Sequence, residues 1–321
     1  MTDSRERVID FKAGARDRPD HVQPFQIEGM DVRGRIVRLG QAADESVLAH
    51  AYPAPLARLM GEFLALTAML GSIFKSEGLL TVQAKAAGDA PVNFIVADYA
   101  TPGDLRGYAD FDAEALAELS ETSGLDELIG RGGYLALTIE QGRRQERYQG
   151  IVELEGESLA ESAVSYFERS EQTPTTLRLA AGRSTADGAW RAGGIMVQHL
   201  AGATRERPER HRHLEVIDSH EEENRTRAAT LMNSVRDTEL LDPGLPLNDL
   251  LYRLFHEEGV RVFEPVAIGH RCRCSKDRTR ALLDRFPKAE LAEMVVDGEI
   301  VATCQFCNAR YRFDPAEVGD E

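Results

Sequence analysis

Residues 270–307 read HRCRCSKDRTRALLDRFPKAELAEMVVDGEIVATCQFC and contain all four cysteines of this 321-residue chain. The cysteines form two close pairs, Cys272 with Cys274 and Cys304 with Cys307, and residues 275–303 separate the pairs. Each pair can supply two corners of a tetrahedron once the intervening residues fold back, and four thiolates complete a closed structural zinc site. The stretch therefore predicts one zinc ion per chain, which holds together a small C-terminal zinc-binding domain over residues 257–321.

Other interpretations of the cysteines and their neighbours are weaker. Four unrelated buried thiols are not expected to fall within one short segment of a long chain. His256 and His270 lie near the pairs and could replace a thiolate, but a histidine in such a place is more often a hydrogen-bonded structural residue. Both are second choices as zinc ligands.

Six basic residues crowd the first cysteine pair: Arg271, Arg273, Lys276, Arg278, Arg280 and Arg285. A zinc ribbon could use them to bind phosphates, but no aromatic residue is interleaved among them. They could instead form a solvated helix face, or lower the pKa of the thiols and offset the negative charge of a tetrathiolate zinc centre. Because the chain carries a formal net charge of -16, we favour these two interpretations over a zinc-ribbon nucleic-acid-binding protein, which stays as the alternative.

The first part of the chain, residues 1–200, is expected to be an α+β domain of mixed sheet and helix. With 42% hydrophobic residues the chain can bury a substantial core in two or three domains. The first thirty residues are polar and irregular, and we expect them to lie outside the fold. Alternating apolar residues between turn signals predict strands over 31–39, 79–86, 92–99, 105–111, 133–142, 147–156, 175–181 and 191–200. Helical spacing of apolar residues predicts helices over 55–74, 113–121 and 158–168.

The linker, residues 201–256, begins with a polar stretch around 205–223 that we interpret as an exposed connector. Two amphipathic helices follow. The first places Ala228, Leu231, Met232 and Val235 on one stripe, and the second, which begins behind Pro246, places Leu247, Leu250, Leu251, Leu254 and Phe255 on another. Such stripes must be buried against something, and we expect the zinc domain to be their packing partner.

Several classes of protein are disfavoured by the rest of the sequence. The longest apolar stretch, residues 63–74, is short of the ~20 residues that span a membrane, and the charged N-terminus is unlike a secretory signal, so we expect a cytoplasmic protein. The glycine-rich residues 130–133 lack the spacing of a phosphate-binding loop and predict a turn. Ser158 and Ser170 lack a nucleophile-elbow context, and His211, His213 and His220 are interpreted as part of a solvated linker. We therefore do not expect this protein to be an enzyme.

Three further stretches accompany the cysteine pairs. They are YPAPLARLMGEFLALTAMLGSIFKSEGLLTVQAKAAGDAPVN at 52–93, ERYQGIVELEGESLAESAVSYFERSEQTPT at 146–175 and LYRLFHEEGVRVFEP at 251–265. Together they resemble the heat-shock protein 33 family of redox-regulated holdase chaperones over residues 31–313. Two features depart from the usual pattern of that family: the polar insertion at 205–223, and Asn308 and Ala309, where a glycine is more usual.

The resemblance implies a compact, zinc-bound and inactive reduced state, with Cys272, Cys274, Cys304 and Cys307 as metal ligands. It also implies an oxidised state that releases zinc, unfolds the linker and holds unfolded or oxidatively damaged client proteins without ATP. Local disulfides, Cys272 to Cys274 and Cys304 to Cys307, fit this switch because sequence neighbours can meet disulfide geometry. The resemblance further implies a reduced monomer and an oxidised homodimer. The negative net charge and the lack of a long apolar stretch lead us to expect neither nucleic acid nor membrane as a partner. Client contacts are expected at Leu231, Met232, Val235, Leu247, Leu250, Leu251, Leu254 and Phe255.

Overall fold

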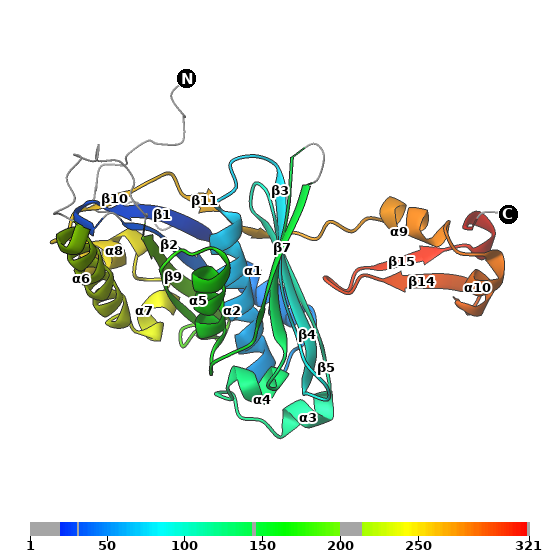
Figure 1. The fold of residues 1–321 in the computed structure, drawn as a ribbon. Coiled ribbons are helices and arrows are strands. Elements are labelled where there is room, and N and C mark those ends of the chain that lie inside the picture. Colours follow the sequence, from blue (N-terminus) through cyan, green and yellow to red (C-terminus); the bar gives the residue numbers. More distant parts are fainter. Residues whose placement is uncertain (1–19, 31, 143–145, 200–213, 320–321) are drawn as a thin grey trace.

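Helix α2 (Ala54–Gly71) is the apolar centre of the protein and lies between two large sheets in the computed structural model (Figure 1). The structure describes residues 20–30, 32–142, 146–199 and 214–319. Pro53 and Pro55 suit the first turn of α2, and the predicted helix is confirmed. Gly61 lets the helix approach one of the two sheets closely, since a side-chain carbon there would lie 2.6 Å from the Ala181 methyl group. By length and composition α2 is the one described helix that could cross a membrane, but 89% of it is buried inside the protein.

Sheet A has the strand order β10-β1-β2-β9-β8, and β11 also pairs with β1. Its strands are β1 (His21–Ile27), β2 (Val32–Leu39), β8 (Thr175–Arg183), β9 (Trp190–His199), β10 (Val260–Val262) and β11 (Val266–Ala267). The expectation that the first thirty residues lie outside the fold is wrong for β1. Its sequence contains Pro24 and polar residues that disguise the strand, yet His21 and Gln23 are buried.

Sheet B has the order β12-β5-β4-β3-β6-β7. Its strands are β3 (Gly78–Lys85), β4 (Val92–Ala100), β5 (Asp104–Phe111), β6 (Tyr134–Gln141), β7 (Glu146–Glu153) and β12 (Gly269–His270). Helices α1 (Gln41–Leu48), α3 (Ala113–Ala117), α4 (Leu125–Ile129) and α5 (Leu159–Ser170) complete the first domain. Helix α5 begins as predicted, because the Ser158 hydroxyl caps it by accepting from the Glu161 amide. The α+β fold class is confirmed.

The two faces of sheet A are covered by different helices. Val37 and Met196 belong to the core around α2, whereas their neighbours Ile36 and Ile195 belong to a second core on the opposite face. That second core is closed by α6 (Leu214–Asn233), α7 (Asp237–Leu241) and α8 (Leu247–Phe255), which lie beside β1 and β2 in Figure 1. The expected packing of the linker helices on the zinc domain is therefore wrong. The outer face of sheet A offers them a larger apolar surface.

Part of the polar stretch at 205–223 is helical, because α6 begins at Leu214, and Glu222 and Glu223 at its end are exposed. Residues 205–213 lie outside the described residues. Of the helix stripes, Ala228, Met232 and Val235 are buried, as are Leu247, Leu250, Leu251 and Phe255, while Leu231 and Leu254 are half-buried against the same core.

The C-terminal module lies to one side of the two sheets in Figure 1, and its cysteine-bearing end contacts sheet B. It contains α9 (Lys276–Leu283), α10 (Lys288–Glu293), β13 (Val295–Val296), β14 (Glu299–Thr303), β15 (Arg310–Phe313) and the 3-10 helix Pro315–Glu317. Its small core consists of Leu283, Leu291, Ile300, Phe313 and Val318. Residues 260–270, which we expected within this domain, instead extend sheets A and B through β10, β11 and β12.

Candidate metal centre

The four cysteines come together where the irregular segment after β12 meets the turn between β14 and β15. Cys272 and Cys274 follow β12, and Cys304 and Cys307 lie in the turn between β14 and β15. That turn closes on itself, since the Asn308 amide donates to the Cys304 carbonyl at 2.8 Å and the Cys304 amide donates to the Ala309 carbonyl at 2.9 Å. Asn308 adopts a left-handed conformation with φ of 55°, which asparagine tolerates better than most residues. The asparagine thus replaces the glycine that the family resemblance leads us to expect.

The sulfur geometry fits a tetrahedral metal ion. All four Sγ atoms lie within 4.8 Å of one another, with Cys272 3.6 Å from Cys304 and Cys274 3.4 Å from Cys307. Four sulfurs at the usual zinc–sulfur bond length of ~2.3 Å are roughly 3.8 Å apart. All four side chains are half-buried, so the centre is partly shielded from solvent. Among the described residues this is the one cluster of cysteine, histidine and carboxylate side chains that could hold a metal ion.

The thiols of the cluster differ in acidity. Burial alone would raise the pKa of Cys272, but hydrogen bonds from the Cys274 amide and the Arg106 guanidinium outweigh it and lower this pKa to about 7. Burial raises the pKa of Cys304 and of Cys307. Cys272 therefore becomes a thiolate, which is the reactive and metal-binding form, more readily than Cys304 or Cys307.

The predicted ligands and their neighbours fall into two groups. The four cysteines are brought together, whereas the second-choice histidines are not part of the cluster. The ring of His256 lies 3.2 Å from the Tyr252 carbonyl, and that of His270 lies 3.4 Å from the carboxylate of Glu45. Both thus have local partners, as expected for structural histidines.

Several of the basic residues near Cys272 are paired with acidic groups of the chain. Arg271 lies 3.7 Å from Asp104, Arg273 2.7 Å from Asp98 and Arg280 3.2 Å from Glu317. These contacts leave less positive charge for phosphates than the sequence suggests. Sequence reasoning missed Arg106, whose Nη1 lies 3.6 Å from the Cys272 sulfur, because no local pattern joins it to a residue so far along the chain.

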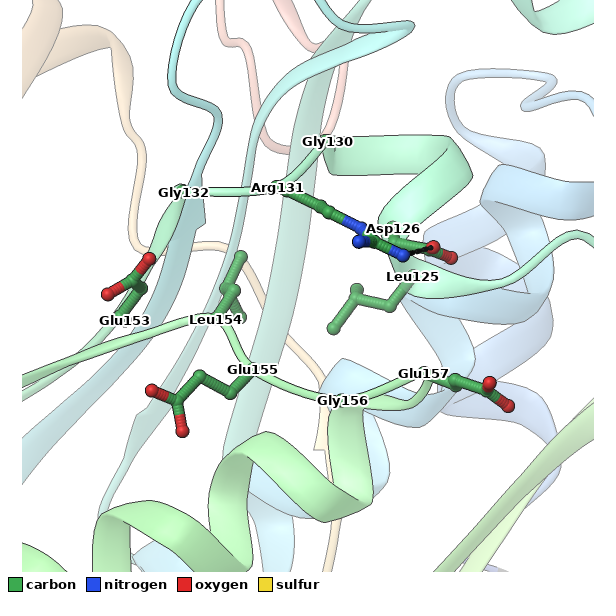
Figure 2. Close-up of a pocket in the computed structure, with 10 residues that line it drawn as sticks. All are labelled: Leu125, Asp126, Gly130, Arg131, Gly132, Glu153, Leu154, Glu155, Gly156 and Glu157. Atoms are coloured by element: carbon green, nitrogen blue, oxygen red, sulfur yellow. Dashed lines mark ion pairs between the residues drawn. The ribbon is translucent and has the colours of Figure 1, made fainter.

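The glycine-rich residues 130–133 form the predicted turn before β6. Gly130 and Gly132 have φ angles of 78° and 81°, which other residues rarely adopt. Figure 2 shows the shallow pocket of about 330 Å³ beside this turn, where Arg131 reaches Asp126 at 3.7 Å. Glu153, Glu155 and Glu157 are among the residues that line the pocket, and this negative charge repels phosphate groups, so the pocket gives no support to a nucleotide site.

The chain was compared with known proteins. The sequence model of the family described as "Hsp33 protein" matches residues 20–314. The 33 kDa chaperonin of Caulobacter vibrioides is 45% identical over 302 residues, which cover 92% of this chain and 95% of that protein. The 33 kDa chaperonin of Azotobacter vinelandii is 38% identical over 301 residues, 93% of each chain.

A crystal structure of a 33 kDa chaperonin from Thermotoga maritima superimposes with a TM-score of 0.74. It is 23% identical and covers 92% of this chain and 96% of that chain, so it shows a shared fold. The family match covers most of the chain, and both relatives are more than 30% identical over nearly their whole length. The chain belongs to the Hsp33 family.

Proposed function

We propose that this protein is a redox-regulated holdase chaperone, which keeps unfolded or oxidatively damaged client proteins from aggregating without ATP. The observation that carries the proposal is the linker, whose apolar stripes cover an apolar face of sheet A and which leads directly into the four clustered cysteines. The relatives are named chaperonins, which supports protein binding rather than catalysis. We place the protein in the cytoplasm, where thiols are kept reduced until oxidants accumulate.

In the reduced state, Cys272, Cys274, Cys304 and Cys307 would hold one zinc ion. The zinc ion would act as a structural cross-link rather than as a reactive centre, because four thiolates leave no open coordination position. This cross-link matters because the module has a small core of five buried apolar residues. In modules of this size, structural zinc contributes ~10 to 16 kcal/mol of apparent folding free energy.

Oxidation by a peroxide would join Cys272 to Cys274 and Cys304 to Cys307. Each disulfide forms from two thiols and one hydrogen peroxide, which accepts two electrons and leaves as two water molecules. The four sulfurs lie within 4.8 Å of one another but further apart than the ~2.05 Å of a disulfide bond, so the centre must rearrange before a disulfide forms. Short disulfide loops then constrain the chain little, and the long-range cross-link is lost.

The connection from the cysteines to the linker runs through residues 260–270. Val262 on β10 belongs to the same core as Phe255 of α8, and β12 pairs with β5 just before Cys272. If the C-terminal module unfolds, residues 260–270 lose their support at the end that leads to Cys272. Loss of β12 and then β10 would take packing partners from α8 and expose the linker stripes to clients.

Client protection tests the proposal. Peroxide-treated protein should suppress light scattering from a heat-denatured client, whereas the reduced zinc form should do so weakly. Leu231→Ser and Leu254→Ser change half-buried leucines of the stripes and should weaken protection by the oxidised form. Leu282→Ser, at a leucine that is 55% exposed in the module, is the matched control and should have no effect. Client aggregation that is the same with peroxide-treated and reduced protein would refute the proposed function.

Metal content and disulfide mapping test the switch itself. The reduced chain should contain one zinc per chain, and serine at both Cys272 and Cys304 should remove it. Peptide mapping after oxidation should find the two local disulfides. Dominant linkage of Cys272 to Cys304 would refute the local-pair mechanism and leave the unfolding step without its cause.

Association and nucleic-acid binding are separate outcomes. Exposed stripes of two chains can bury one another, so we propose that the reduced form is a monomer and the oxidised form a homodimer. Sedimentation before and after oxidation tests this.

A zinc-ribbon interaction with nucleic acid is disfavoured by the net charge and by the pairing of Arg271, Arg273 and Arg280. Salt-sensitive binding of the reduced chain to DNA or RNA would revive it.

A further inference from the structure

A row of polar side chains crosses the face of sheet B that points away from α2. Thr81, Asp98 and Arg106 are direct neighbours in the register of β3, β4 and β5. The next residue along β5, Gly107, faces α2, since a side-chain carbon there would lie 2.4 Å from the Met60 sulfur. Asp98 is 5% exposed, and its carboxylate accepts from Thr81 Oγ1 at 2.7 Å and from Arg106 Nη2 at 2.6 Å. Arg106 is thereby fixed in one orientation.

The fixed Arg106 makes two contacts at the cysteine centre, and Arg273 of the C-terminal module adds a third contact, to Asp98. Arg106 Nη1 lies 3.6 Å from the Cys272 sulfur, and the Arg106 guanidinium carbon lies 3.7 Å from the centre of the Phe306 ring. Arg273 reaches back from the module and donates to the same Asp98 oxygen at 2.7 Å. One buried carboxylate of the first domain therefore binds one arginine from each side of the boundary.

A second set of contacts lies beside the first. The Phe306 carbonyl is 3.3 Å from the His50 ring nitrogen Nε2, and the Phe306 and Tyr108 rings are 6.2 Å apart. The Asn308 side-chain amide donates to the Ala49 carbonyl at the end of α1. All of these module residues stand next to, or between, cysteines of the two pairs. Their positions relative to one another are therefore set by the arrangement of the four sulfurs.

We propose that Asp98 and Arg106 form a docking site on sheet B for the cysteine module, and that the module stays docked only while the four cysteines are gathered together. The inference rests on the proposed function for its consequence, which is that the first domain senses the state of the cysteines directly as well as through the linker. Arg106 is a positioning residue that presents one cationic plane to both Cys272 and Phe306. Once the two local disulfides form, Cys272 and Phe306 are no longer held side by side. The site formed by Asp98 and Arg106 then no longer binds the C-terminal module.

The test measures the tumbling of the module in the full-length, reduced, zinc-loaded chain. Nitrogen-15 relaxation gives a rotational correlation time for amides of β14 and β15 and, separately, for amides of sheet A. In the parent protein the two values should agree. In Arg106→Gln the value for the module should fall by roughly a third or more while the zinc content stays at the parent level. Oxidised parent protein should show the same loss.

Matched variants separate docking from folding. Arg147→Gln removes an exposed arginine from β7 of the same sheet and should change nothing. Arg106→Lys keeps the charge and a bond to Asp98 but cannot span Cys272 and Phe306, so it should restore docking only in part. Asn308→Gly keeps the left-handed turn and loses the side-chain amide contacts to the Ala49 carbonyl and the His50 ring, and it should give a smaller loss of docking.

The proposal is overturned if Arg106→Gln tumbles as one body with the first domain. Should Arg106→Gln lose its zinc, Asn308→Gly decides in its place, and parent-like tumbling of that variant overturns the proposal equally. None of these measurements uses a client protein. Docking can therefore fail while chaperone activity stands, and the reverse outcome is equally visible.

Discussion

Glu62 is an acidic residue in the middle of the most apolar helix of the protein. Burial raises the pKa of its carboxyl to about 7, although Arg58 lies 2.7 Å away and opposes the shift. The unfolded chain binds this proton with a pKa near 4.5, so the folded state holds it more tightly. The stability that this proton provides is present below pH 4.5 and is lost as the pH rises towards 7.

Glu62→Gln should remove this pH dependence, because an amide keeps the hydrogen bond to Arg58 without the cost of a buried charge. Urea unfolding followed through Trp190, the single tryptophan, should show a stability gain over the parent that grows with pH. The gain should be near zero at pH 4.5 and reach at most about 3 kcal/mol above pH 7. The control is Glu77→Gln, at an exposed glutamate. Equal pH slopes in parent and Glu62→Gln would contradict the assignment.

At the residue scale, the sequence predicts what is local and misses what depends on register. The four cysteines are recognisable because their spacing alone indicates a shared site. Asp98 and Arg106 look like ordinary polar positions of two strands. Only the pairing of β4 with β5 and the return of the C-terminal module reveal that Asp98 binds Arg273 and that Arg106 contacts Cys272. An alternating strand with a charge on one face gives no sign of which segment will cover it.

At the scale of elements, Arg38 of β2 holds the linker onto sheet A. Its guanidinium is buried and donates to the backbone carbonyls of Leu240 at 2.8 Å, Leu245 at 2.6 Å and Glu239 at 3.0 Å. Carbonyls at the end of α7 lack partners within the helix, and a cation there also suits the helix dipole. Gly193 of β9 allows the Leu240 carbonyl to come this close to the sheet.

Arg38→Met should therefore loosen the linker in the reduced protein without touching the cysteines. Losing these bonds to buried carbonyls should destabilise the packed linker by roughly 2 to 4 kcal/mol. Amide hydrogen exchange in α7 and α8 should rise, and an apolar-surface dye should bind more, at unchanged zinc content. Arg33→Met, at an exposed arginine of the same strand, is the matched control. Parent-like exchange in Arg38→Met would show that the linker is held by its apolar stripes alone.

Helices and strands with a strong hydrophobic periodicity could be predicted from the sequence. Those whose place in the fold depends on contacts with another element could not. Helix α2 and the capped α5 follow their sequence patterns closely. Strand β1 was missed because its buried polar residues are satisfied by distant partners, as when the Gln23 amide donates to the Phe263 carbonyl at 2.5 Å. The stripes of α6 and α8 were found, but a stripe does not say which surface it will cover, and sheet A was not foreseen.

At the scale of the whole molecule, the first domain and the cysteine module should differ in their need for metal. Sheets A and B share the large core around α2, whereas the module has five buried apolar residues. A zinc chelator should raise amide exchange in β14 and β15 to the rate of unstructured peptides. The thermal transition of Trp190 fluorescence should stay within a few degrees of its original midpoint. A shift of both signals together would mean that the domains unfold as one unit.

The linker is bracketed by two strands of one sheet, and this shapes how it can be released. Strand β9 ends at His199 and β10 begins at Val260, with β2 and β1 between them, so the two exits are about 14 Å apart at the usual strand spacing. While β10 stays paired, a released linker is a closed loop of roughly 60 residues, whose entropy gain is limited and whose return is fast. Once β10 peels away, the same segment becomes an open tether that carries the module at its far end. A brief exposure to oxidant would then release the linker only until it packs back onto sheet A. A sustained exposure would leave the linker open and let it hold client proteins for longer.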